Sequence, residues 1–104
     1  MADLDIELNG KTATLKWKLP VQKKISAEFG GMFPAHRAIM EYDLDAYAKI
    51  IAIATERMLP DVLDEVQADV FAQGMEALQP DLLKYLNRLV TGGKDPAPAD
   101  ELAA

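Results

Sequence analysis

The pair Asn9-Gly10 constrains the fold more than any other feature of this 104-residue chain. A two-residue type I′ turn needs positive φ at both central positions, and Asn followed by Gly tolerates that conformation best. The turn fixes the pairing of the flanking segments, so that Leu8 faces Lys11. In this register the apolar residues of both strands share one face. They are Leu4, Ile6, Leu8, Ala13, Leu15 and Trp17.

The polar residues of the two strands fall on the opposite face of this predicted hairpin, which we place over residues 3–18. They are Asp5, Glu7, Thr12, Thr14 and Lys16. An isolated hairpin is at best marginally stable in water. Its apolar face is therefore expected to pack on the helices that follow.

Prolines and glycines divide the rest of the chain into five predicted helices. Pro20 suits a first helical position, and Gly30-Gly31 supplies a left-handed stop. Pro34 can open a short second helix. Asp43 is a good N-cap for a third helix, whose wide apolar stripe indicates a central, buried position. The predicted helices cover about residues 20–29, 34–42, 44–58, 61–78 and 80–91.

Pro60 and Pro80 mark the beginnings of the last two predicted helices. The fourth helix carries the following residues inward: Leu63, Val66, Val70, Phe71, Gly74 and Met75. Gly74 inside a helix costs about 1 kcal/mol relative to alanine, so we expect it to serve a close helix approach or a local kink. The last helix has an inward stripe of Leu82, Leu83, Leu86, Leu89 and Val90.

The C-terminal residues 94–104 include Pro96 and Pro98 and have no apolar periodicity, which predicts a disordered tail. The length of the chain suffices for one small core, so we expect a single globular domain over residues 1–93. The predicted fold class is α+β, with an N-terminal β-hairpin packed on a bundle of four to five helices.

Composition and charge argue against several classes of function. Seventeen acidic residues against eleven basic ones give a net charge of −6, which disfavours binding to nucleic acid and to anionic lipid. The chain has no cysteine, which excludes disulfides and thiolate metal sites. The acidic N-terminus does not resemble a secretory signal, and the apolar stretch 50–54 is too short to span a membrane. We therefore expect a protein that starts at or near Met1 and has neither nucleic acid nor membrane as partner.

The charge is distributed unevenly along the chain. Residues 1–37 have six Lys and Arg against four Asp and Glu, a net charge of +2, whereas residues 38–104 have a net charge of −8. This asymmetry is typical either of an ordinary solvated surface or of an interface that orients a partner.

Residues that could carry chemistry are few. His36 is the one histidine and Ser26 the one serine, and no glycines of a nucleophile elbow surround that serine. The acidic clusters at Asp43 and Asp45, and at Asp61, Asp64, Glu65 and Asp69, lack the spacing of a calcium loop. Helix capping and dipole interactions explain them better. We expect no catalytic, metal-binding or cofactor-binding residues, and no enzyme.

Two features could serve protein binding instead. A two-stranded hairpin has free edges, to which another chain can add a strand. Phe29, Met32 and Phe33 beside the Gly-Gly break could form an exposed apolar patch that binds a partner, although packing in the core is the other interpretation.

Four segments together resemble one known plan. They are the hairpin Ile6-Glu7-Leu8-Asn9-Gly10-Lys11-Thr12, the helix end Phe29-Gly30, the helix with Leu44-Asp45-Ala46-Tyr47-Ala48-Lys49-Ile50-Ile51, and Val70-Phe71-Ala72-Gln73-Gly74-Met75-Glu76-Ala77-Leu78 before a leucine-rich helix. In this order they are similar to the small tail-assembly proteins of tailed phages and gene transfer agents, a group that includes tail assembly chaperones. The likeness covers residues 5–93 and contains no catalytic signature.

The resemblance implies a non-enzymatic protein that acts in the bacterial host cytoplasm during tail morphogenesis. It also implies binding to the tape measure protein or the tail tube protein while the tail polymerises. It leaves open whether the protein is a homo-oligomer, and whether it is a transient chaperone or a tube component. The alternative is a small cytoplasmic protein-binding regulator whose acidic helices contact a basic partner.

Overall fold

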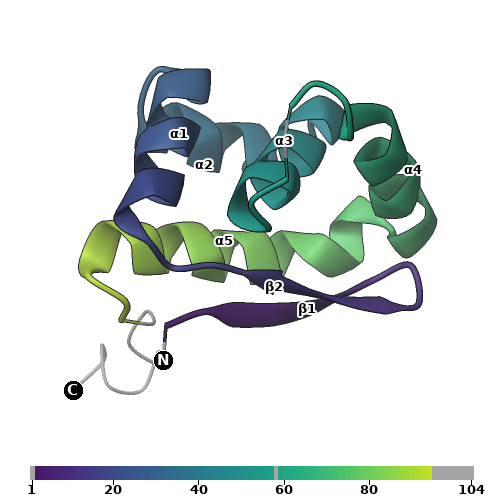
Figure 1. The fold of residues 1–104 in the computed structure, drawn as a ribbon, viewed down its shortest axis with the longest axis horizontal. Coiled ribbons are helices and arrows are strands. Elements are labelled where there is room, and N and C mark those ends of the chain that lie inside the picture. Colours follow the sequence, from purple (N-terminus) through teal and green to yellow (C-terminus); the bar gives the residue numbers. More distant parts are fainter. Residues whose placement is uncertain (1, 58, 95–104) are drawn as a thin grey trace.

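The structure is a computed structural model that describes residues 2–57 and 59–94. The chain begins with an antiparallel hairpin of β1 (Leu4–Leu8) and β2 (Lys11–Leu15), which lies along one side of the helices (Figure 1). Five helices follow: α1 (Leu19–Phe29), α2 (Met32–Met40), α3 (Leu44–Ala54), α4 (Leu63–Gln73) and α5 (Met75–Thr91). This arrangement confirms the predicted α+β class. The disordered tail predicted for residues 94–104 lies outside the described residues, except for Lys94.

The hairpin has the predicted register. Leu8 pairs with Lys11 at the turn and Leu4 pairs with Leu15 at the far end. Asn9 and Gly10 have φ of 52° and 78°, the positive values that the type I′ turn requires. The apolar face is largely buried, but Trp17 is 39% exposed because β2 ends before it.

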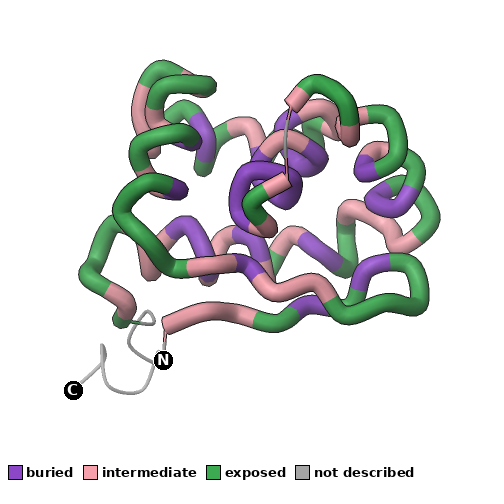
Figure 2. Tube along the Cα trace, viewed as in Figure 1, coloured by how far each residue is buried: buried purple, intermediate pink, exposed green. Residues whose placement is uncertain are grey.

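The core is built around α3, as the wide apolar stripe predicted. Every residue from Ala46 to Ala54 is buried except Lys49, and Figure 2 shows buried residues also on the sides of the other helices that face α3. Asp43 caps this helix, since its Oδ1 accepts a hydrogen bond of 3.3 Å from the Ala46 amide. The core therefore brings together one central helix, the apolar face of the hairpin and the inner faces of the surrounding helices.

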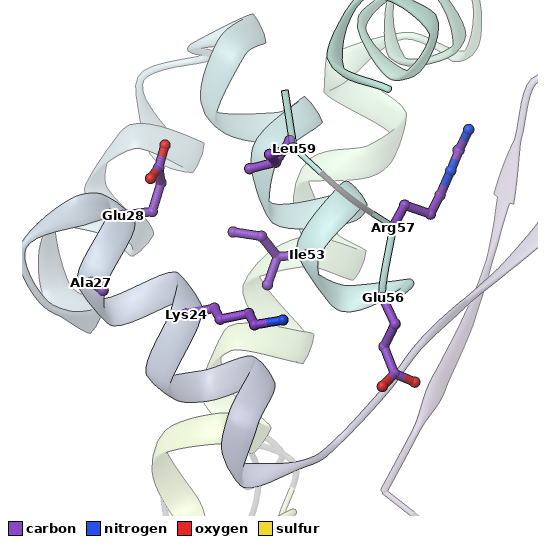
Figure 3. Close-up of a pocket in the computed structure, with 7 residues that line it drawn as sticks. All are labelled: Lys24, Ala27, Glu28, Ile53, Glu56, Arg57 and Leu59. Carbon is purple, nitrogen blue, oxygen red and sulfur yellow. The ribbon is translucent and has the colours of Figure 1, made fainter. Parts of the chain in front are cut away.

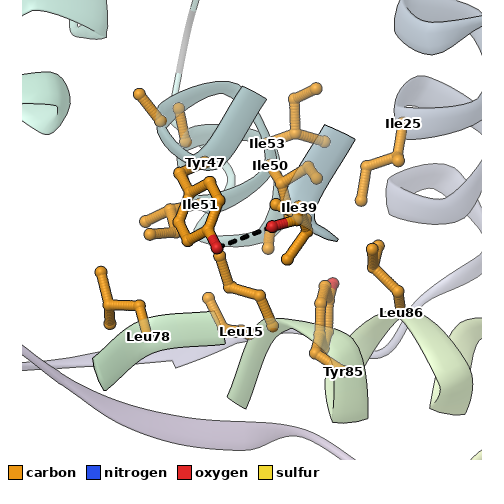
Figure 4. Close-up of a cluster of buried hydrophobic side chains, with 14 of the residues drawn as sticks. Leu15, Ile25, Ile39, Tyr47, Ile50, Ile51, Ile53, Leu78, Tyr85 and Leu86 are labelled. Carbon is orange, nitrogen blue, oxygen red and sulfur yellow. Dashed lines mark hydrogen bonds between the residues drawn. The ribbon is translucent and has the colours of Figure 1, made fainter. Parts of the chain in front are cut away.

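Two tyrosines place hydroxyl groups within this core. The Tyr47 hydroxyl donates a 2.8 Å hydrogen bond to the Ile39 carbonyl (Figure 4), and the Tyr85 hydroxyl donates to the Lys16 carbonyl. Each bond satisfies a polar group that burial would otherwise leave unpaired. Burial raises the pKa of Tyr47 to about 12 and also raises that of Tyr85, so both are neutral donors at physiological pH.

The boundary between the last two helices differs from the prediction. The helices expected at 61–78 and 80–91 are instead separated at Gly74, and Pro80 lies inside α5. Gly74 has φ 97° and ψ 122°, a conformation that glycine adopts easily and other residues rarely do. A proline removes one helical hydrogen bond, to the carbonyl of the residue four positions earlier, here the exposed Glu76. Water can satisfy that carbonyl, so the predicted break at Pro80 was wrong.

Two further helices have bounds that differ from the predicted ones by two to four residues. α3 ends at Ala54 and not at residue 58, because Glu56 has φ 61° and the Arg57 amide bonds back to the Ala52 carbonyl. This is a helix stop of the kind that glycine usually makes, formed here by a glutamate. α2 covers Met32–Met40 and not residues 34–42, so that Pro34 is its third residue. Proline is tolerated there because the first amides of a helix have no partner within it.

Two apolar side chains that were expected inside lie outside. Phe71 in α4 is 77% exposed, and Val90 near the end of α5 is exposed as well. The buried stripe of α4 is formed by Val66, Asp69 and Val70. Phe71 follows Val70 directly and is rotated away from that stripe by about 100° around the helix.

Candidate partner-binding surfaces

The three residues predicted to bind a partner lie at the turn between α1 and α2. Gly30 ends α1 in the left-handed conformation, with φ 77° and ψ 26°, and its amide bonds to the Ser26 carbonyl. Phe29 and Met32 are partly buried and pack against the core, whereas Phe33 is 76% exposed. Phe29 and Met32 therefore fit the interpretation of core packing, whereas Phe33 fits the interpretation of an exposed apolar patch.

Phe33 belongs to a longer exposed face of α2. Met40 lies seven residues further along and is also exposed, with the exposed His36 and Arg37 between them. Residues spaced by three, four and seven positions share one face of a helix. Arg37 pairs with Glu41 at 3.6 Å on this surface. We call Phe33, His36, Arg37 and Met40 the α2 face.

A second apolar surface, which the sequence analysis missed, lies where α1 begins and α5 ends. The exposed Leu19 borders a hollow of about 350 Å³. Its lining residues are Trp17, Lys18, Leu19, Gln22 and Leu89. The Trp17 indole is held by a 2.9 Å hydrogen bond from its Nε1 to the Arg88 carbonyl. Leu19 directly precedes Pro20, so the sequence pattern at this point is dominated by the proline that opens the helix.

A second hollow, of about 430 Å³, lies between α1 and the end of α3 (Figure 3). It is lined by Lys24, Ala27, Glu28, Ile53, Glu56, Arg57 and Leu59. Figure 3 shows Ile53 and Leu59 near its middle, while the side chains of Glu56 and Arg57 point away from each other.

The carboxylates of this hollow already have partners. Glu28 pairs with Lys49 and Glu56 pairs with Lys18, each at 3.1 Å. The hydrogen bonds from Lys49 to Asp45 and Glu28 raise the pKa of that lysine. An apolar floor with ion pairs at its rim suits an apolar side chain of a partner better than acid–base chemistry.

The acidic and histidine residues do not form a metal site in the part of the chain that the structure describes. No group of three or more His, Asp or Glu side chains converges there. His36 is exposed on α2, and Asp64 and Glu65 lie in the first turn of α4, where the helix dipole favours acids.

Asp69 has a role that the sequence analysis missed. It is only 7% exposed, and its carboxylate accepts hydrogen bonds from the Asn9 side-chain amide at 3.0 Å and from Lys11 Nζ at 3.4 Å. The backbone amide of Asn9 donates to Gln73 Oε1 at 2.8 Å. The Asn9 bond, followed by that from Lys11, holds the pKa of Asp69 below its usual value. α4 thereby fixes the tip of the hairpin.

A third hollow, of about 330 Å³, lies beside β2. It is lined by Leu8, Lys11, Thr12, Ala13, Thr14, Lys16, Thr55, Arg57 and Asp69. These residues come from the hairpin, from the end of α3 and from α4. We call this hollow the β2 groove.

Comparison with known proteins gives no match: no family model, no curated protein and no solved structure is significantly similar to the chain. Among the described residues, no helix is both long and apolar enough to cross a membrane.

Proposed function

We propose that the protein is a non-enzymatic tail-assembly protein of a tailed phage or gene transfer agent. In this proposal it binds the tape measure protein or the tail tube protein in the host cytoplasm and covers aggregation-prone segments of it until they are built into the tail. The order of hairpin and helices that resembles small tail-assembly proteins is the reason for naming these partners.

The observation that carries the binding function is the exposed ring of Phe33. The Phe33 ring is 76% exposed, so a partner that covers it removes apolar surface from water, which stabilises the complex. Met40 is a second exposed apolar side chain on the same face of α2. Exposed apolar side chains gathered on one helix face favour a protein-interaction site.

The alternative, an acidic regulator of a basic partner, has less support. Two of the acids in α4 are already paired within the chain, Glu65 with Arg57 at 3.1 Å and Asp69 with Lys11 at 3.4 Å. Binding through acidic helices would weaken steeply with salt, whereas binding through apolar surface would not. The salt dependence of partner binding therefore separates the two functions.

Co-expression with the tape measure protein, and separately with the tail tube protein, tests the proposal. The protein should raise the soluble fraction of the tape measure protein, and Phe33→Ser should reduce that effect. Phe71→Ser is the matched control, because it removes an aromatic ring of similar exposure that lies on α4 and not on the α2 face. If neither the tape measure protein nor the tail tube protein gains solubility, the proposed function is wrong.

A further inference from the structure

The outer edge of β2 contains an open stretch of backbone. In the observed register, the backbone N–H and C=O groups of Thr12, Thr14 and Lys16 face away from β1. At Lys16 these groups are used, since its amide donates to the Ala54 carbonyl at 2.8 Å and its carbonyl accepts from Tyr85. Among the described residues, the backbone groups of Thr12 and Thr14 have no hydrogen-bond partner. The edge is therefore closed at Lys16 and open from Thr14 toward the turn.

The open edge borders the β2 groove. Thr12 and Thr14 line one side of the groove, and Thr55, Arg57 and Asp69 from the helical side line the other. A groove between a strand edge and helices is a site where an extended peptide can add to the sheet. The main chain of such a peptide bonds to the edge, while alternate side chains enter the groove.

The charge of the groove favours an acidic ligand. Lys11, Lys16 and Arg57 line it together with one carboxylate, Asp69. The other carboxylates that pair with these cations are Asp3, 3.9 Å from Lys16, and Glu65, 3.1 Å from Arg57, and neither lines the groove. Surface ion pairs of this kind are weak, so the cations can exchange partners when an acidic segment binds.

The two faces of the hairpin define the pattern of side chains in the ligand. On the inner face, an added strand continues the surface of Leu8 and Ala13, where an apolar side chain fits. On the outer face it lies beside Thr12 and Thr14, where an acidic side chain is a diagonal neighbour of Lys16 and within reach of that long side chain. β1 of a second copy has this alternation, but its Ile6 and Leu8 are buried in their own core and cannot enter another groove.

We propose that the β2 groove binds an extended segment of a partner protein, with alternating apolar and acidic residues, as a third strand of the sheet. This inference deepens the proposed function and rests on it only for the statement that the partner is a protein.

Amide hydrogen exchange measured by NMR on the full chain tests the inference. The probe is the capped hexapeptide Asp-Leu-Asp-Ile-Glu-Leu, which has the required alternation. At saturation the amide exchange of Thr12 and Thr14 should slow by about ten-fold or more, because a hydrogen-bonded amide exchanges only when the strand opens. The amides of Ala13 and Leu15, which already face β1, should change little. The charge-reversed peptide Lys-Leu-Lys-Ile-Lys-Leu should bind about ten-fold more weakly.

A variant pair adds a second test. Thr14→Pro removes an outward amide without removing a hydrogen bond to β1, and should abolish peptide binding. Thr14→Val is the control, since both variants lose the 2.7 Å hydrogen bond from the Thr14 hydroxyl to Asp5 but only valine keeps the amide. The exchange experiment on the unmodified protein stands even if the proline variant does not fold.

No slowing at Thr12 and Thr14 with the peptide at about 1 mM, the weak end of specific binding, would overturn the inference. Equal binding to a folded Thr14→Pro would overturn it as well. If the peptide protects these amides but tape measure solubility does not change, the proposed partner is wrong while the strand-addition site stands. If tape measure solubility rises but the peptide does not protect these amides, strand addition is refuted while the proposed function stands.

Discussion

The contact between Asp69 and the hairpin tip leads to a quantitative prediction. The buried carboxylate of Asp69 receives one hydrogen bond from Asn9 and one from Lys11. Asp69→Asn keeps the shape of the side chain and one oxygen acceptor, but it removes the negative charge. We therefore expect the variant to fold with the hairpin less firmly attached to α4.

The magnitude follows from the two bonds. A hydrogen bond to a charged group contributes about 1.5–3 kcal/mol and a neutral one about 0.5–1.5 kcal/mol, so the Asn9 bond weakens by about 1 kcal/mol. The Lys11 side chain is 63% exposed. Its ion pair therefore adds at most about 1 kcal/mol. The weakened Asn9 bond and the lost Lys11 ion pair together mean that Asp69→Asn should lower the free energy of unfolding by about 1–2 kcal/mol. This corresponds to a decrease in Tm of about 5–10 °C for a domain of this size.

Urea denaturation at neutral pH measures this loss. Asp61→Asn is the control, because Asp61 is exposed and precedes α4, and it should change stability by less than about 0.5 kcal/mol. Asn9→Gly removes the side-chain donor while keeping a residue that tolerates positive φ, so the double variant should show coupling of about 1 kcal/mol. If Asn9→Gly and Asp69→Asn are additive, the assigned contact does not stabilise the protein.

The same contact determines a pH dependence. The pKa of Asp69 is lower in the folded protein than in the unfolded chain, so the carboxylate stabilises the fold above the unfolded value of about 3.9. This contribution is lost as the pH falls through the folded pKa. The stability difference between the unmodified protein and Asp69→Asn should therefore shrink from pH 6 toward pH 2. A difference that is constant over this range contradicts the assignment.

Three further substitutions should separate backbone, core and surface effects. Gly74→Ala should cost at least about 1 kcal/mol in urea denaturation, because φ is 97° although nothing lies within 4 Å of the added carbon. No loss would mean that α4 and α5 join differently. Tyr47→Phe should cost only about 1 kcal/mol, because Gln79 Nε2 also donates to the Ile39 carbonyl at 3.3 Å, and a loss above about 3 kcal/mol would contradict this shared acceptor. Phe33→Ser should change the Tm by less than about 3 °C, since its ring is exposed, and a larger decrease in thermal unfolding would assign that ring to the core.

The hairpin and the central helix could be predicted because several local signals agree there. The turn chemistry of Asn9-Gly10 and the alternation of both strands require the same register, and Asp43 and a wide apolar stripe both indicate α3. The helix boundaries depended on single residues with two possible roles. The sequence pattern favours Gly74 as a helical residue and Pro80 as a break. The backbone conformation of Gly74 and the exposure of Glu76 to solvent reverse these two roles.

The candidate surfaces were less predictable than the fold. Helical spacing alone assigns Phe71 and Val90 to an inner face, but exposure depends on which neighbours cover each face. The contact between Asp69 and the hairpin tip joins residues about sixty positions apart, so no local sequence pattern indicates it. The β2 groove likewise needs the end of α3 beside the hairpin, which only the packed chain defines.

The central claim is that this protein acts by binding a partner protein through exposed surface. Size-exclusion chromatography with light scattering measures this most directly, on the purified protein mixed with the tape measure protein and, separately, with the tail tube protein. We predict a complex of defined mass that persists at high salt and is weakened by Phe33→Ser but not by Phe71→Ser, which removes an exposed ring outside the α2 face. Separate elution of the tape measure protein and of the tail tube protein from this protein, at every salt concentration, would contradict the claim.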